Sequence, residues 1–383
     1  MGSVIPQVVI STEGEDIEGT DGHDNYWVTV SIDGIETNKG DDTIIAEGRI
    51  GDVDTGDGAD VITLNDGADD VFLGEGSDTF FGYGDFDEID SSDAADWLYI
   101  EGSVGTLETG DSLDVATVIG TVDTLLSGRG ADNVTVIGDV RRLDTDQGQD
   151  TIHVEGDVER FDSGRGHDTA TVIGNVQALS LDRGNDTLDM EGDVAILDAN
   201  RGHDVIGIDG SAGQVKLGNG NDIFSATGTV DFLSGGRGHD QVSIGGGGTL
   251  KFARGNDTLE ASGHVDQVFG GSGHDHFTLN GGGALVYMGG WNDTIVSSAP
   301  SGDWYGGAGR DTVEITRSVN DFDIVVSDQF VELTNTATDE LTRLADFETL
   351  IFSDASVKVA DLYDAYDPWD DVNPQTDSIW DLG

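Results

Sequence analysis

Cysteine is absent from this sequence of 383 residues, proline occurs only 4 times, and 17 lysines and arginines stand against 76 aspartates and glutamates. The lack of cysteine excludes a fold held by disulfides. The formal charge of −59 excludes nucleic acid as a partner and disfavours unaided binding to an anionic membrane, since both are negatively charged themselves. No apolar run is long enough to predict a transmembrane segment, and no cleavable N-terminal signal peptide is expected.

What the sequence does have is an aspartate that returns every 18 residues. The aspartates with this spacing are Asp24, Asp42, Asp60, Asp78, Asp96, Asp114, Asp132, Asp150, Asp168, Asp186, Asp204, Asp222 and Asp240, followed, after the loss of one residue within 245–248, by Asp257, Asp275, Asp293 and Asp311. A fixed period over residues from about 20 to 315 predicts a solenoid of about 17 coils. The four prolines, at positions 6, 300, 368 and 374, stand outside the regular coils, as expected where strands must donate hydrogen bonds on both sides.

Each repeat has the same internal pattern. Apolar residues stand two and four positions after the aspartate, as Val134 and Val136 do after Asp132. This alternation is typical of a short strand. A glycine such as Gly138 then predicts a turn, and a second apolar position, Leu143 in this repeat, predicts a second strand. The expected coil is therefore strand, turn, strand, turn, which gives an all-β parallel solenoid.

The residues just before the aspartate complete a nine-residue motif, and two such motifs make one period. Residues 128–132 read Gly-Arg-Gly-Ala-Asp, residues 164–168 Gly-Arg-Gly-His-Asp, and residues 271–275 Gly-Ser-Gly-His-Asp. They resemble the nonapeptide of the repeats-in-toxin (RTX, haemolysin-type) proteins, Gly-Gly-x-Gly-x-Asp-x-apolar-x. The resemblance implies a right-handed parallel β-roll in which calcium ions, roughly one per coil, lie in the turns between successive coils along one edge.

The resemblance also implies which residues hold calcium, namely the aspartates and the turn glycines whose carbonyl oxygens face the ion. The expected set is Asp24, Asp42, Gly56, Gly58, Asp60, Asp69, Gly74, Gly76, Asp78, Gly128, Gly130, Asp132, Asp150, Gly164, Gly166, Asp168, Asp186, Asp204, Gly218, Gly220, Asp222, Gly236, Gly238, Asp240, Asp257, Gly271, Gly273, Asp275, Asp293, Gly307, Gly309 and Asp311.

Departures from the motif limit where calcium is expected. Both edges fit calcium only between about residues 55 and 90, where Asp69 and Asp87 stand half-way between the repeated aspartates. In the central repeats the half-way position holds Arg141, Glu159, Gln177, Ala195 or Gly213, so the opposite edge is expected to be free of metal. The glycine two residues before the aspartate is replaced by Ala94, Ser112 and Trp291, which weakens the motif at Asp96, Asp114 and Asp293.

A physical argument supports calcium without the resemblance. Neighbouring coils lie about 4.8 Å apart, and carboxylates stacked at that spacing repel by roughly 1 kcal/mol per pair even in water. Calcium takes six to eight oxygen ligands, and glycine-rich turns allow carbonyl groups to face a common centre. The alternative is that the aspartates merely end turns, but ordinary turns need no fixed spacing.

Two further columns accompany the aspartates. Arginine stands three residues before the aspartate at Arg129, Arg165, Arg183, Arg201, Arg237 and Arg254. Local charge compensation is one interpretation, and a docking strip for an acidic glycan or a neighbouring molecule is the other. Histidine and asparagine alternate one residue before the aspartate, from His167 to Asn292. This alternation indicates a duplicated two-coil unit, with a transition-metal or pH role as the alternative.

Beyond residue 316 the pattern changes. The segment Asp346-Phe-Glu-Thr-Leu-Ile-Phe-Ser-Asp resembles the C-terminal cap of RTX proteins, and a cap is needed because an open solenoid end exposes strand edges. The expected organisation is an N-terminal strand at 1–19, the calcium-binding β-roll at 20–316, a β cap at 317–362 and an acidic tail at 363–383. The resemblance places an uncleaved type I secretion signal in that tail, so the protein is expected to be secreted.

The remaining question is enzyme or structural protein. Parallel β-solenoids include polysaccharide lyases and epimerases, which need a base, an acid and a group that neutralises the sugar carboxylate. The candidates His153, Lys216, Lys251 and Tyr287 are scattered along the sequence, so no catalytic site is expected. The prediction is a secreted calcium-binding solenoid with a structural, surface-layer, matrix or adhesive role, and with itself or an extracellular polysaccharide as further partner. The alternative is a polysaccharide-binding or polysaccharide-modifying protein.

Overall fold

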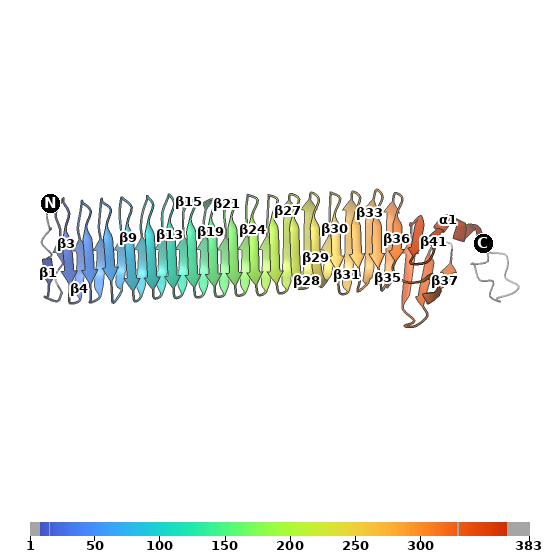
Figure 1. Cartoon of the computed structure of the whole chain (residues 1–383), viewed down its shortest axis with the longest axis horizontal. Coiled ribbons are helices and arrows are strands. Elements are labelled where there is room, and N and C mark those ends of the chain that lie inside the picture. The colour runs from blue at the N-terminus through green and yellow to red at the C-terminus, as the bar shows by residue number, and fades with distance from the viewer. Residues whose placement is uncertain (1–7, 15, 328, 366–383) are drawn as a thin grey trace. The chain divides into compact units, whose positions relative to one another are not determined.

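The computed structural model of the chain describes residues 8–14, 16–327 and 329–365, which fall into two units, Met1–Ala212 (unit 1) and Gly213–Gly383 (unit 2). Both units consist of coils in which strands of successive repeats run parallel to each other (Figure 1). The predicted all-β parallel solenoid of about 17 coils, with an 18-residue period and further C-terminal strands, is confirmed.

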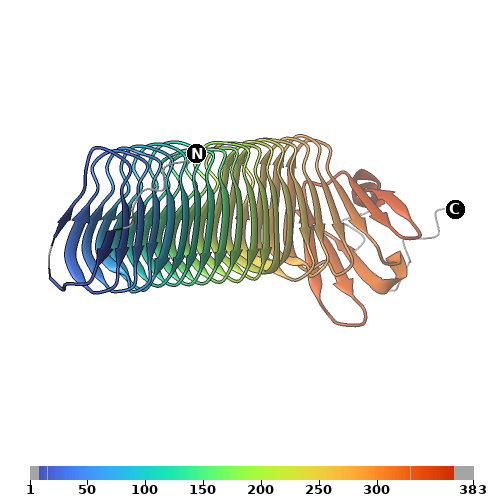
Figure 2. The same cartoon turned by 60° about the vertical axis from the view of Figure 1, so that its left-hand side comes forward.

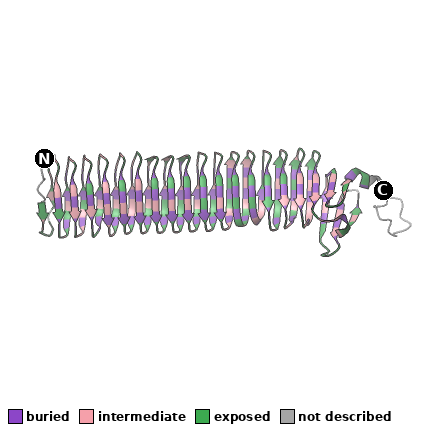
Figure 3. Cartoon of the chain, viewed as in Figure 1, coloured by how far each residue is buried: buried purple, intermediate pink, exposed green. Residues whose placement is uncertain are grey.

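The first sheet of unit 1 is formed by the strands that follow the repeated aspartates. In β19 (Thr151–Glu155) the side chains of Ile152 and Val154 are buried, while Thr151 and Glu155 are exposed. This alternation of buried and exposed residues recurs along the sheet (Figure 3). The other strands of the sheet are β1 (Val8–Ile10), β3 (Asn25–Val28), β5 (Thr43–Ala46), β7 (Val61–Leu64), β9 (Thr79–Tyr83), β11 (Trp97–Glu101), β13 (Val115–Ile119), β16 (Asn133–Ile137), β22 (Thr169–Ile173), β24 (Thr187–Glu191) and β26 (Val205–Asp209).

The second sheet of unit 1 supplies the facing wall of the core. In β17 (Val140–Asp144) the buried residues are Val140 and Leu143, three positions apart. The other strands are β2 (Ile17–Glu18), β4 (Ile32–Glu36), β6 (Ile50–Asp54), β8 (Ala68–Phe72), β10 (Phe86–Asp90), β12 (Val104–Glu108), β14 (Val122–Leu126), β20 (Val158–Asp162), β23 (Val176–Ser180) and β25 (Val194–Asp198). A small third sheet of β15 (Arg129–Gly130), β18 (Gln147–Gly148) and β21 (Arg165–Gly166) lies in the turns before the aspartates.

The pairing between coils turns the sequence period into columns of side chains. Val134 of β16 pairs with Ile152 of β19, and Ile152 pairs with Ala170 of β22, each partner lying 18 residues further on. Figure 2 shows the strands of neighbouring coils side by side in this arrangement. Residues at equal positions of successive repeats are therefore direct neighbours in space.

Unit 2 has the same coil pattern, in which six strands are longer than those of unit 1 and four have only four residues. They are β27 (Ala212–Asn219), β28 (Ile223–Arg237), β29 (Gln241–Lys251), β30 (Thr258–Ala261), β31 (Val265–Ser272), β32 (His276–Leu279), β33 (Gly283–Gly290), β34 (Thr294–Ser297), β35 (Gly302–Ala308) and β36 (Thr312–Ile315). Ala226 pairs with Ile244, a difference of 18, but Thr229 pairs with Gly246, a difference of 17. The predicted loss of one residue at the glycine run is confirmed.

The strands beyond residue 316 add hairpins to the last coils of unit 2, at the orange and red end of Figure 2. They are β37 (Phe322–Val326), β38 (Val331–Asn335), β39 (Leu341–Ala345), β40 (Thr349–Phe352) and β41 (Ser356–Lys358), preceded by the 3-10 helix η1 (Val319–Asp321) and followed by α1 (Val359–Ala365). β39 and β40 pair in parallel with β35 and β36, whereas β38 pairs antiparallel with both β37 and β39. The predicted secretion signal falls, beyond Ala365, outside the described residues.

Candidate metal-binding edge

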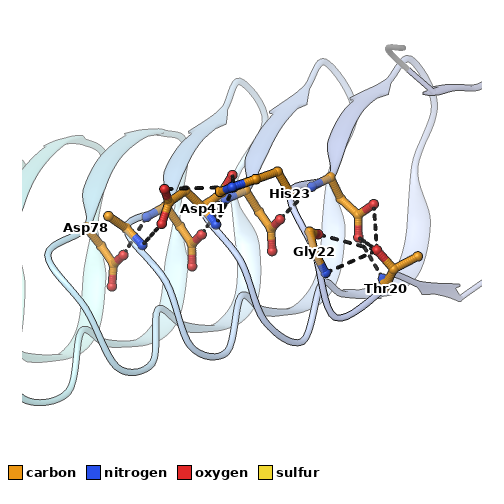
Figure 4. A network of polar contacts seen from close by, with 9 residues as sticks. Thr20, Gly22, His23, Asp41 and Asp78 are labelled. Carbon is orange, nitrogen blue, oxygen red and sulfur yellow. Dashed lines mark hydrogen bonds and ion pairs between the residues drawn. The ribbon is translucent and has the colours of Figure 1, made fainter. Parts of the chain in front are cut away.

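The repeated aspartates form a buried column in each unit, directly before the first strand of each coil. From Asp42 to Asp311 their exposed fractions do not exceed 3%. Asp24, in the first coil, is only half-buried, and its carboxylate accepts hydrogen bonds from the backbone and side chain of Thr20 (Figure 4). The structure therefore brings the predicted aspartates of each unit together along one edge.

Each aspartate uses one carboxylate oxygen to hold the coil before it. The N–H of Asp150 donates to Oδ1 of Asp168 at 2.9 Å, and in unit 2 the N–H of Asp257 donates to Oδ1 of Asp275 at 2.9 Å. The other oxygen, Oδ2, is buried and has no hydrogen-bond partner among the described residues at Asp42, Asp60, Asp78, Asp96, Asp114, Asp132, Asp150, Asp168 and Asp186 in unit 1, and at Asp275, Asp293 and Asp311 in unit 2. A buried charged oxygen without a partner is costly, so this column calls for a cation.

Burial also changes the acidity of the column. Desolvation, reinforced by repulsion from neighbouring aspartates, raises the pKa to about 7 at Asp78, Asp114, Asp150, Asp186, Asp240 and Asp293. Desolvation also raises the pKa to about 6 at Asp60, Asp96, Asp168, Asp257 and Asp275. A divalent cation bound here would offset the same desolvation penalty that otherwise favours protonation.

The turn glycines are required because backbone carbonyl groups occupy the space of a side chain. A Cβ added at Gly166 would lie 1.4 Å from the carbonyl oxygen of Gly148, one coil earlier. Two residues before it, Gly164 has a φ of +74°, which is unfavourable for residues with a side chain. The turns thus stack carbonyl oxygens beside the carboxylate column, and both are the hard oxygen ligands that calcium prefers.

Calcium bound at this edge would need backbone carbonyl ligands in addition to the carboxylates of the column. Among the described residues no group of three or more histidine, cysteine, aspartate or glutamate side chains could by itself hold a metal ion. Each coil supplies one buried carboxylate of the column, so the remaining ligands of an ion would have to be backbone carbonyls, as the nonapeptide resemblance implies. The assignment of individual ligands stays a prediction.

Three aspartates with a weaker motif share the geometry of the column. Asp96, Asp114 and Asp293 are as buried as their neighbours, and each has an unpartnered Oδ2. The residues that replace glycine before them still adopt positive φ, +126° at Ala94, +134° at Ser112 and +88° at Trp291. We therefore add Asp96 and Asp114 to the candidate ligands, for which the 18-residue spacing was the better signal.

A column of buried hydroxyl groups beside the aspartates of unit 1 was missed by the sequence analysis. Thr145 donates to the carbonyl oxygen of Ser163 at 2.9 Å, and Ser163 donates to that of Leu181 at 3.2 Å, again one coil further on. The members are Thr37, Thr55, Ser91, Thr109, Ser127, Thr145 and Ser163. Their shared position, five residues before the aspartate, was the available signal.

The opposite edge of unit 1 is held by side chains. The N–H of Asp157 donates to Oδ1 of Asp139 at 2.9 Å, and the N–H of Asn175 donates to Oδ1 of Asp157 at 2.8 Å. Asp69, which was expected to bind calcium on this edge, is exposed and pairs with Arg49 at 2.6 Å. Its role as a ligand stays a prediction.

The alternating histidines and asparagines have a structural function. Nδ1 of His167 accepts a hydrogen bond from the N–H of Asn185 at 2.8 Å, and Oδ1 of Asn185 accepts one from the N–H of His203 at 2.8 Å. In the first coils His23 and Asp41 are bonded in the same way (Figure 4). Imidazole and amide serve here as equivalent acceptors, which explains why either residue type suits the position.

The candidate catalytic residues do not form a site in either unit. His153 lies on β19 of unit 1, where Nε2 is 3.2 Å from Glu155. In unit 2, Lys251 lies over the ring of Phe269 at 5.7 Å, and Tyr287 stacks on the other side of that ring at 5.8 Å. Lys216 belongs to β27. Lys251 and Tyr287 thus share an aromatic column, which no part of the sequence analysis foresaw.

No helix of the described part is both long and apolar enough to cross a membrane.

The chain was compared with protein families, curated sequences and solved structures. The sequence model for the RTX calcium-binding nonapeptide repeat matches residues 52–80, 73–99, 142–170, 217–248 and 253–277. No curated protein sequence matches the chain. Among solved structures, it is similar to a hyperactive, Ca2+-dependent, β-helical antifreeze protein from an Antarctic bacterium, at 19% identity and a TM-score of 0.37, over 94% of this chain and 96% of that one. The chain carries calcium-binding nonapeptide repeats of the RTX, haemolysin-type family.

Proposed function

We propose that the chain is a secreted structural solenoid that folds when calcium binds along the aspartate column. The observation that carries this proposal is the series of buried, unpartnered Oδ2 atoms from Asp42 to Asp186 and from Asp275 to Asp311. Without a cation, each coil adds another desolvated negative charge next to the last. With calcium, the same oxygens link one coil to the next, so folding and binding become one event.

The long, regular exposed surfaces suit a surface-layer, matrix or adhesive role. Each column presents the same kind of side chain at intervals of about 4.8 Å, so weak contacts with a repeated partner can add up. The calcium concentration outside cells would then control where the protein becomes rigid. We propose no enzymatic activity, because the candidate catalytic residues serve other contacts.

A matched pair of substitutions tests the calcium column. Asp150→Asn keeps an acceptor oxygen for the N–H of Asp132 but removes the charge of one buried carboxylate. Asp157→Asn makes the same chemical change on the opposite, exposed edge. Calorimetric titration should show fewer bound calcium ions and a higher calcium midpoint for Asp150→Asn, with wild-type values for Asp157→Asn. Equal behaviour of the two variants would contradict the assignment of the edge.

Export is tested at the other end of the chain. We propose that residues 363–383 direct type I secretion without cleavage. Deletion of this segment should abolish export from a host that carries a type I apparatus, while the calcium-induced circular dichroism of the purified protein stays unchanged. Export of the truncated chain would contradict the proposed signal.

A polysaccharide-binding role is the second candidate, and the aromatic column of unit 2 favours it. Tyr287 and Tyr305 stack with centroids 4.4 Å apart, and Phe330 meets Tyr305 edge-on at 6.3 Å. Beside them lies a pocket of about 500 Å³, lined also by Val331, Leu344 and Phe347. Aromatic and apolar walls with a few polar groups are typical of sugar-sized ligand sites.

Affinity electrophoresis in gels containing alginate or pectin tests this candidate. Tyr305→Ala should reduce the retardation seen for the calcium-loaded protein, whereas Thr117→Ala, on the exposed face of β13, should not. Release of unsaturated uronate during incubation would instead favour a lyase. If neither polysaccharide retards the wild type, the structural role stands alone.

A further inference from the structure

Between residues 57 and 201, the column three residues before each aspartate consists of two halves of opposite charge, and Lys39 precedes the acidic half. The acidic half consists of Asp57, Glu75, Asp93 and Asp111. The basic half consists, in the next five coils, of Arg129, Arg165, Arg183 and Arg201, with Gln147 in the second coil. Backbone bridges and strand pairs join neighbouring members, for example Asp57 with Glu75 and Arg165 with Arg183. Both halves therefore share one edge and one spacing; β15 and β21, labelled in Figure 1, carry Arg129 and Arg165.

The four arginines have no partner for their guanidinium groups within the described part of the chain. All four are exposed, and no ion pair or side-chain hydrogen bond joins them to any of the acidic residues around them. Three other arginines of unit 1 are paired, Arg49 with Asp69, Arg141 with Asp123 and Arg142 with Asp144. Stacking like charges without internal partners is unfavourable, and a partner outside the chain removes that penalty.

The acidic half is held in position for such a partner. Oδ1 of Asp93 accepts the N–H of Asp111 at 3.4 Å, and Oδ1 of Asp111 accepts the N–H of Arg129 at 3.3 Å. At the other end Lys39 pairs with Asp57, whose side chain remains 49% exposed. The carboxylates therefore form an ordered row that continues directly into the arginine row.

An apolar patch marks the junction between the halves. Leu113 stands beside Asp111 with 56% of its surface exposed, and Ala95 and Ala131 occupy the same position in the coils before and after. An apolar centre with charged residues on either side is the usual composition of a protein–protein interface. At 56%, Leu113 is the most exposed large apolar residue in the described part of unit 1.

We propose that this edge of unit 1 binds the same edge of a second copy of the chain, in antiparallel orientation about a two-fold axis near Leu113. The symmetry places the acidic half of each copy against the basic half of the other, and every contact occurs twice. With the axis between Asp111 and Arg129, Asp111 meets Arg129 of the second copy and Glu75 meets its Arg165. Both copies have the same coil spacing, so Asp57 also meets Arg183, while Asp93 meets the neutral Gln147. The match ends there, because Lys39 would meet Arg201.

Other partners fit these observations less well. A parallel second copy would set like charges against each other. An acidic polysaccharide would contact the arginines but leave the acidic row and Leu113 without a role. The proposal rests on the proposed function in one respect, since calcium must first order the coils that carry the two rows.

Sedimentation velocity of the full chain in millimolar calcium tests the dimer. The wild type should form a dimer that weakens as salt is added. Arg165→Glu combined with Arg183→Glu should weaken the dimer at least tenfold. Arg142→Glu combined with Arg160→Glu makes the same charge change on the exposed positions of β17 and β20 and should leave the dimer intact.

A charge exchange separates this interface from a general electrostatic effect. One variant carries the two substitutions Arg165→Glu and Arg183→Glu, and a second carries Glu75→Arg and Asp57→Arg. Each should be monomeric alone, because the substituted residues then meet like charges. The mixture should form heterodimers, because each substituted residue of one variant meets an opposite charge on the other. Leu113→Asp should also prevent dimer formation.

Circular dichroism on the same samples keeps the two proposals distinguishable. Wild type that folds with calcium but stays monomeric up to submillimolar concentration overturns the dimer and leaves calcium-dependent folding intact. Failure of the mixture to form heterodimers, with both variants folded, also overturns it. A dimer that survives the double arginine substitution places the interface elsewhere and overturns this assignment.

Discussion

The two units share the aspartate column but differ in the buried side chains five residues before each aspartate. In seven coils of unit 1 the position five residues before the aspartate holds a hydroxyl side chain, and six of these donate to the next coil, as Thr145 does to Ser163. Leu73, Leu181 and Ala199 occupy the position in other coils of the unit. In unit 2 the same position alternates between large residues and glycine, as Leu217, Gly235, Phe252, Gly270, Met288 and Gly306. A hydrogen-bonded row of equal side chains and an interlocking row of large and small ones thus fill equivalent space. Both units therefore require the aspartate and its glycine turn, whereas the residue type five positions before the aspartate varies.

The acidity of the metal-free column should produce the largest effect, and in both units. The pKa of Asp150 in unit 1 and of Asp240 in unit 2 is raised to about 7 by burial, so the folded state holds protons that the unfolded state has released. The resulting stability is fully present below the ordinary pKa of about 4 and is lost as the pH rises through about 6 to 7. In a chelator, the urea midpoint should therefore be higher at pH 5 than at pH 8.

Calcium should reverse this trend, because protons compete for the same oxygens. The calcium midpoint of folding should fall as the pH is raised from about 6 to 8. A metal-free protein that becomes more stable from pH 5 to pH 8 would show that these carboxylates are not desolvated as the structure has them.

Removal of single column members should affect both units alike. Asp186→Ala leaves the N–H of Asp168 without its acceptor, and Asp275→Ala does the same to Asp257. Each should cost roughly 2–5 kcal/mol of calcium-loaded stability, since a buried donor and a metal ligand are lost together. Asp24→Ala, in the half-buried first coil, should cost much less. Denaturant midpoints in excess calcium measure all three, and equal losses would argue against a cooperative stack.

Substitutions five residues before the aspartate should change stability by different mechanisms in the two units. In unit 2, a Cβ at Gly270 would lie 2.4 Å from the carbonyl oxygen of Met288 and 2.8 Å from Oδ2 of Asp275. Gly270→Ala should therefore cost about 1–3 kcal/mol by overpacking. In unit 1, Thr145→Val removes one buried hydrogen bond and should cost about 1 kcal/mol. Urea denaturation measures both stability losses. Unchanged stability of Gly270→Ala would contradict the close packing of large residues against glycines in unit 2.

The smallest effect is expected for an exposed ion pair of unit 1. Arg141 pairs with Asp123 across neighbouring coils, and both side chains are more than half exposed. Arg141→Gln should change the stability by less than about 0.5 kcal/mol, because water screens the pair. Thermal unfolding with and without added salt checks this. A loss as large as that of Thr145→Val would mean that an exposed ion pair contributes to coil stacking as much as a buried hydrogen bond does.

The sequence was sufficient to predict the coils and their register, but not the buried side-chain contacts beside the aspartates. Spacing alone predicted the buried column from Asp42 to Asp311 and the shift at Gly245, because one residue position per coil leaves no freedom once the period is fixed. The hydroxyl of Thr145 was not predicted, because a threonine before a turn is common and its acceptor lies 18 residues away. The boundaries proposed for the N-terminal strand, the C-terminal cap and the tail stay predictions.

The two charged columns show the same limit. The arginines were visible in the sequence, and so was the question of what neutralises them. Only the structure shows that the guanidinium groups of Arg165 and Arg183 have no partner among the described residues and that Asp111 continues the same row. Likewise, the strict alternation of His167 and Asn185 suggested duplication. The structure shows that each side chain accepts a hydrogen bond from a backbone N–H of the next coil.

Circular dichroism of the wild type during a calcium titration at pH 8 tests the central claim most directly. In a chelator the chain should lack most of its β signal, because the 16 buried carboxylates from Asp42 to Asp311 would otherwise be stacked within the two units without a cation. Addition of calcium should restore the signal in one cooperative transition. A full β signal in the chelator at pH 8, unchanged by calcium, would contradict the account.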